Sequence, residues 1–222
     1  MDFLKILRSF EEFLFEAASW LIFYPLTLWR IVRSPLAMMA YSDREQSDST
    51  EGRYDDALSP PLLLLVTLVL TGAVGAALHV GQPTGGSHLE RYLAAAPQNL
   101  VLFRSLAFSL IPLVAAVILL RRQGGRLSRD TLRPPFYAQC YLVAPLALAI
   151  SVGGDIFQRT EVPDIWGVLV MLVGAGWFLA AQARWFARRL SVSVVRGGLT
   201  AVTAVVTALV LLLLIVAPIA LF

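Results

Sequence analysis

Residues 61–80 read PLLLLVTLVLTGAVGAALHV, a run of apolar and small residues that no charged residue interrupts. A stretch of about 20 apolar residues is what an α-helix needs to cross a hydrocarbon core about 30 Å thick. Four more such runs, each with at most one charged residue, lie at residues 100–120, 135–154, 165–187 and 199–222. The sequence therefore predicts an all-α, polytopic integral membrane protein in which residues 60–222 form a domain of five transmembrane helices.

The composition excludes several classes of protein. Of the 222 residues, 58% are hydrophobic and 15% are charged, whereas soluble domains have about 45–50% and about 25%. A soluble enzyme and a disordered chain are both excluded. The net charge of +3 does not indicate nucleic-acid binding, because the basic residues lie at the ends of the apolar runs rather than in one patch. The single cysteine, Cys140, and two histidines offer no metal-ligand spacing, so no cofactor is expected.

The arginines alternate between the loops. The loop after the second run, together with the end of the fourth run and the loop after it, holds nine arginines, and the loops after the first and third runs hold one each. Because basic residues favour the cytoplasmic side, the N-terminus is predicted inside and the C-terminus outside a bacterial inner membrane. We expect contacts with anionic lipid headgroups from Arg121, Arg122, Arg126, Arg129, Arg133, Arg184, Arg188 and Arg189.

The N-terminal region, residues 1–40, has a different pattern. Apolar residues recur at spacings of three and four from Phe3 to Leu21, with charged residues on the other side, which is typical of an amphipathic helix. Pro25 is expected to kink it. We interpret the region as one or two helices that lie in the cytoplasmic interface. The alternative is a sixth span at residues 13–32, which would carry Glu16 into the membrane.

Residues 41–59 contain six acidic residues and two arginines. Such a polar segment is predicted to be a cytoplasmic linker. Its charge is opposite to that of the arginine-rich loops, so one hypothesis is that it folds back over them; the other is that it stays solvated.

Charged or titratable residues near the outer ends of the runs are the other candidate sites. Arg104 lies about one turn inside the second run, Asp155 follows the third, and His79 is near the end of the first. Charges inside a membrane are costly and are frequently functional. Arg104 is either an outer-leaflet anchor or a contact for an anion or a lipid headgroup, and Asp155 is its nearest expected partner at the same depth.

Three segments resemble the Yip1-like family of five-span membrane proteins. They are FYPLTLWRIVRSPLAMM at residues 23–39, SPPLLLLV at residues 59–66 and PFYAQCYLVAP at residues 135–145. The resemblance implies five closely spaced spans behind a cytoplasmic N-terminal region, and bacterial members are often labelled permeases.

Two functions follow as expectations. The first is a non-enzymatic membrane protein that organises the bilayer or binds a partner, either a protein at its cytoplasmic face or a second copy of itself. The second is a small transporter, or a transporter subunit, with a path near Arg104 and Asp155. An aqueous cavity near the middle of the membrane would favour the second.

Overall fold

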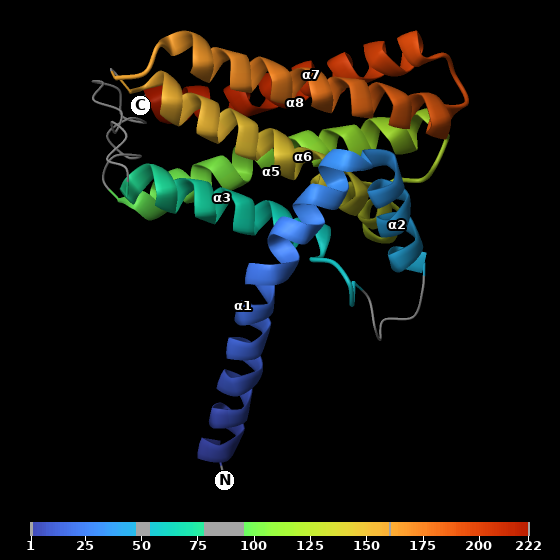
Figure 1. The fold of residues 1–222 in the computed structure, drawn as a ribbon. Helices are drawn as coiled ribbons and strands as arrows, with labels where there is room; N and C mark the ends of the chain where they lie inside the picture. Colours follow the sequence, from blue (N-terminus) through green and yellow to red (C-terminus); the bar gives the residue numbers. More distant parts are fainter. Residues whose placement is uncertain (1, 48–53, 78–95, 160, 222) are drawn as a thin grey trace.

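The computed structural model describes residues 2–47, 54–77, 96–159 and 161–221, and these residues form helices joined by short connections (Figure 1). The helices are α1 (Asp2–Arg33), α2 (Pro35–Ser47), α3 (Pro60–Ala77), α5 (Pro97–Arg122), α6 (Arg129–Phe157), α7 (Asp164–Leu190) and α8 (Val194–Leu221).

Five of these helices, namely α3, α5, α6, α7 and α8, are long and apolar enough to cross a bilayer. This confirms the predicted all-α fold with five candidate membrane spans, and the chain is a multi-pass membrane protein. Several helices extend beyond the predicted apolar runs. For example, α6 begins at Arg129 because Ser128 caps it: the Ser128 side chain accepts a hydrogen bond from the Thr131 backbone, and the Thr131 hydroxyl accepts one from the Ser128 backbone.

Helix α6 is the centre of the bundle. It packs against α3, α5 and α7, and also against the two N-terminal helices, while α8 closes the bundle against α5 and α7. Consecutive residues of α6 from Ala138 to Ala147 are buried on every side. Since a helix that is apolar all round belongs in a core, α6 is the element around which the other spans assemble.

Glycines allow the spans to approach closely. A Cβ atom placed on Gly167 of α7 would lie 2.5 Å from the carbonyl oxygen of Gly153 on α6. Gly197 of α8 meets the carbonyl of Ala183 on α7 in the same way. In lipid no hydrophobic effect drives helices together, so their association depends on close van der Waals packing, which small residues at such crossings allow.

Helix α1 runs across the membrane-spanning helices rather than along them (Figure 1). It continues through Pro25 without ending, and its axis bends on the way to α2. Ser34 separates it from α2 because Pro35 begins a new helix. Among the described residues, α1 has no window apolar enough to count as a candidate span. Its position in the interface stays a prediction.

The segment predicted to be a linker includes residues 48–53, which lie outside the described residues; the parts on either side of them are structured. Residues 41–47 belong to α2, and residues 54–59, which we call the clasp, pack between α1 and α6. The Tyr141 hydroxyl of α6 donates to the Leu58 carbonyl over 2.7 Å, and the Leu58 amide donates to the Thr27 hydroxyl of α1 over 3.2 Å. The clasp packs against the helices because Ala57 and Leu58 are buried. The prediction of a linker was based on the acidic residues and did not anticipate this burial.

Tyr54, the first residue of the clasp, has a left-handed backbone conformation with φ at 61°. Its amide donates to the Glu45 carboxylate over 2.7 Å, and its hydroxyl accepts from the Gln46 side chain over 2.9 Å. Its ring meets the rings of Tyr41 and Tyr141 edge-on. A left-handed conformation is costly for a tyrosine and persists only where its surroundings fix it, so Tyr54 is the fixed point between α2, the clasp and α6.

Candidate functional site

The arginines gather at one end of the bundle, which we call the arginine-rich end. It comprises the end of α5, the start of α6, the end of α7 and the start of α8. The structure brings all of the predicted headgroup arginines to this end: Arg121, Arg122, Arg126, Arg129, Arg133, Arg184, Arg188 and Arg189.

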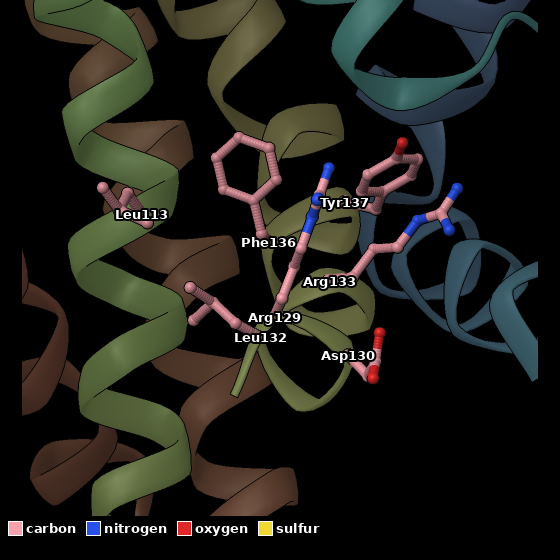
Figure 2. A pocket seen from close by; sticks show the side chains of 7 residues that line it. All are labelled: Leu113, Arg129, Asp130, Leu132, Arg133, Phe136 and Tyr137. Atoms are coloured by element: carbon pink, nitrogen blue, oxygen red, sulfur yellow. The ribbon is translucent and has the colours of Figure 1, made fainter. Parts of the chain in front are cut away.

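A pocket of about 580 Å³ opens there between α5 and α6 (Figure 2). Leu113 of α5 and Leu132 and Phe136 of α6 form its apolar wall, and Arg129 and Arg133 form its charged edge. The two arginines are four residues apart, so one helix face presents both of them. Ser128 fixes where that face begins, because it caps α6.

Figure 2 shows how the charges around this pocket are divided. The Arg129 side chain lies on the same side as the rings of Phe136 and Tyr137, and the Asp130 carboxylate points the other way. The Arg133 guanidinium lies 5.3 Å from the centre of the Tyr137 ring, a cation–π contact. Within the described ranges, neither arginine of the pocket forms an ion pair with an acidic side chain. Two guanidinium groups are thus available to an anion beside an apolar wall.

Some of the other arginines at this end have protein partners. Arg122 donates to the Thr200 hydroxyl over 2.6 Å. Arg189 lies 3.2 Å from the Asp43 carboxylate and 5.1 Å from the centre of the Trp185 ring. These two side chains tie α5 to α8 and α7 to α2. The Asp43 contact is also the point at which the acidic segment meets the arginine-rich end.

A second, smaller cavity of about 280 Å³ lies between α7 and the turn from α1 to α2. Arg184 and Arg188 line it together with Ser34 and Pro35. The remaining two arginines, Arg121 and Arg126, are exposed like those of the first pocket, but they line neither of these cavities.

The opposite end of the bundle carries the predicted intramembrane charges. Asp155 of α6 is 8% exposed, and its carboxylate packs against Gly75 of α3, where a Cβ atom would lie 3.4 Å away. Arg104 and Arg159 act on it electrostatically, but among the described residues neither forms an ion pair with it within 4.0 Å. The structure therefore brings Arg104 and Asp155 to neighbouring helices without a direct pair. His79 lies outside the described residues.

The middle of the bundle contains a cavity of about 320 Å³ between α5, α6, α7 and α8. Every residue that lines it is apolar, including Phe108, Leu146 and Phe178. A buried water needs two to four polar partners, so this cavity is suited to hydrocarbon rather than to water.

No known protein family, characterised protein or solved structure matches this chain. The resemblance to the Yip1-like family therefore rests on the sequence segments alone.

Sequence reasoning missed several polar groups that the fold buries. Gln139 of α6 and Gln182 of α7 are fully buried, and in the described part of the chain the Gln139 amide has no hydrogen-bond partner. The network of Tyr41, Tyr54 and Tyr141 was also missed. The signal for the glutamines was a polar residue inside an apolar run, whereas nothing in the sequence pairs the tyrosines.

Proposed function

We propose that this protein is a non-enzymatic membrane protein that organises the bilayer by holding anionic phospholipid at its arginine-rich end. The observation that carries this proposal is the pocket of Figure 2, where Arg129 and Arg133 stand beside an apolar wall and have no acidic partner among the described residues. In this role the site binds and releases lipid and changes no covalent bond.

The chemistry of the pocket matches a phospholipid in both of its parts. Guanidinium groups bind phosphate oxygens through charge-assisted hydrogen bonds. Leu113 and Phe136 offer an apolar surface for the first carbons of an acyl chain. Tyr137 lies beside Arg133, and aromatic residues of this kind are typical of the boundary of a membrane. The pocket therefore combines groups that suit a phosphate with groups that suit an acyl chain.

The same proposal includes an orientation and a location. The bias of basic residues toward the loops at the arginine-rich end favours the cytoplasmic side for that end. The N-terminus is then inside and the C-terminus outside, and the arginine-rich composition points to a bacterial inner membrane. A Yip1-like role in membrane organisation fits this arrangement.

The test compares lipid retention by matched charge variants. The full chain is placed in nanodiscs of phosphatidylcholine and phosphatidylglycerol in equal amounts, extracted gently, and examined by native mass spectrometry for bound lipid. We expect Arg129→Gln/Arg133→Gln to lose the retained phosphatidylglycerol. Arg121→Gln/Arg126→Gln removes the same charge from side chains that are also exposed but do not line the pocket, and this variant should retain the lipid. Equal loss in both variants would show general attraction by the basic surface and would contradict a site in the pocket.

The alternative, a small transporter, is favoured by one observation, the burial of Asp155 near Arg104. The apolar cavity in the middle of the bundle argues against it, because a polar solute would find no hydrogen-bond partner there. A transport role predicts that Asp155→Asn abolishes uptake of a solute while leaving lipid retention intact.

A further inference from the structure

The position of α1 relative to the spans is fixed by side chains of its middle part. The Tyr24 hydroxyl donates to the Thr67 hydroxyl of α3 over 3.2 Å, and Thr27 accepts from the Leu58 amide just before α3 begins. Thr67 is seven residues into α3, which corresponds to about 10 Å along the helix axis. The middle of α1 is therefore level with the first two turns of a membrane-spanning helix.

The two faces of this part of α1 differ sharply. Thr27 and Ile31 face the bundle and are fully buried. On the other side Leu21 is 79% exposed, Ile22 is 68% exposed and Trp29 is 63% exposed. Ile22 and Trp29 are seven residues apart, so they lie on the same line of the helix. Within the described structure, this apolar face is not covered by protein.

The depth of α1 identifies what covers this face. Leu65 of α3, which lies in the same two turns, is also apolar and exposed, as a residue that faces lipid should be. The apolar face of α1 continues this surface at the same level, while its long axis lies crosswise to the spans (Figure 1). The apolar face of α1 is thus covered by the acyl chains of the leaflet at the arginine-rich end, close to the headgroups. Arg8 and Glu11, which are exposed in the first part of α1, suit a helix that borders the headgroups.

We propose that α1 inserts into one leaflet only, as a wedge, and that it makes the protein accumulate in bilayers whose arginine-rich face is convex. The spans occupy both leaflets equally, whereas α1 adds area to one leaflet only. A helix inserted about 5–10 Å into the headgroup and acyl boundary binds best where lipid packing on that side is loosened by curvature. The inference goes beyond the lipid-binding role and uses none of the arginines that carry it.

The test measures protein density on single vesicles of increasing diameter. The labelled full chain is reconstituted into phosphatidylcholine and phosphatidylglycerol vesicles, and only molecules whose N-terminus is accessible from outside are counted. We expect the density to rise as the diameter falls. The variant Leu21→Ala/Ile22→Ala/Trp29→Ala, which we call the wedge variant, should lose this dependence of density on diameter.

A matched control removes apolar surface from the spans. Leu172 of α7 and Leu199 and Leu213 of α8 are 65–66% exposed, and their replacement by alanine should leave the size dependence unchanged. The same dependence in the wedge variant and the wild type would overturn the proposal. A dimer that disappears only in the wedge variant would show that a second copy covers α1, and it would overturn the proposal too.

A second measurement does not depend on reconstitution yield. The fluorescence of Trp29, taken as the difference between wild type and Trp29→Phe, should be quenched by lipids brominated near the top of the acyl chain. Absence of quenching would place Trp29 outside the leaflet and contradict the wedge. Arg129→Gln/Arg133→Gln should keep the size dependence, and the wedge variant should keep its bound phosphatidylglycerol, so that failure of one proposal is distinguishable from failure of the other.

Discussion

The two ends of the bundle treat charge in opposite ways. The arginine-rich end spreads most of its charges over open loops and helix ends, where water screens them, and the pair of Asp43 and Arg189 is the exception. The opposite end buries one carboxylate, Asp155, against a glycine, with two arginines at a distance. An exposed charge costs little and contributes little, whereas a buried charge depends on every partner it has. The difference shows that the contribution of a charged residue to stability depends on its burial and its partners, and not on how many charges surround it.

The largest effect is expected from removing a charge near Asp155. Arg104→Gln leaves the buried carboxylate with Arg159 alone. Because Arg104 attracts Asp155 from beyond 4.0 Å rather than in a direct pair, the free energy of unfolding should fall by at most about 3 kcal/mol. Because the charge left behind is the cause, Asp155→Asn in the same chain should restore most of the loss. Thermal unfolding in detergent measures both changes.

A control at the other end sharpens the contrast. Arg126→Gln alters an exposed arginine and should change the unfolding free energy by less than about 0.5 kcal/mol. If it destabilises the protein as much as Arg104→Gln does, the distinction between the two ends is wrong.

An intermediate effect is expected at Tyr54, which joins α2 to the bundle. Tyr54→Ala removes the ring contacts and the hydrogen bond from Gln46 and should weaken the docking of α2 by about 2 kcal/mol. Tyr54→Phe keeps the ring and should lose about 1 kcal/mol. Hydrogen exchange of the α2 amides is the measurement.

The control for the Tyr54 variants is Asp55→Ala, which alters an exposed neighbour and should leave exchange in α2 unchanged. Equal exchange in Tyr54→Ala and the wild type would show that the clasp does not hold α2.

The smallest effect concerns the pair of Asp43 and Arg189. Burial raises the pKa of the Asp43 carboxyl, and Arg189 opposes that rise in part. A carboxyl whose pKa is higher in the docked state favours docking at low pH. Protection of α2 from exchange should therefore be greatest at acidic pH and fall as the pH rises through the pKa of the docked carboxyl.

Variants of this pair isolate its contribution. Arg189→Gln should raise the pKa further and weaken docking at neutral pH by less than about 1 kcal/mol, because the arginine is 40% exposed. Asp43→Asn should remove the dependence on pH that this group causes. A pH profile that Asp43→Asn leaves unchanged would assign the titration to another group.

The spans could be predicted from the sequence because their information is local. The length of each apolar run, such as residues 61–80, and the arginine content of each loop can both be read directly from the sequence. Helix ends were less accessible, since α6 begins six residues before its apolar run under the control of a serine cap. The end of the bundle at which each arginine lies was therefore predictable, although the pocket between Leu113 and Arg129 was not.

What the sequence did not reveal depends on rotation about helix axes. Periodicity defines the faces of a helix but not the neighbour that each face meets. The approach of Gly153 to Gly167 and the packing of Asp155 against Gly75 are of this kind. The clasp was hidden for another reason, because two buried residues, Ala57 and Leu58, outweigh the acidic residues around them.

The central position of α6 has a consequence for biogenesis. Helix α3 is made first among the spans, yet its main neighbour, α6, lies more than fifty residues further along the chain. The hydroxyl that secures the clasp belongs to Tyr141, which is translated 83 residues after Leu58. The ribosome therefore delivers α1, α2 and α3 to the membrane before the surface that orders them exists. Assembly of the N-terminal half has to wait for the third span to be inserted.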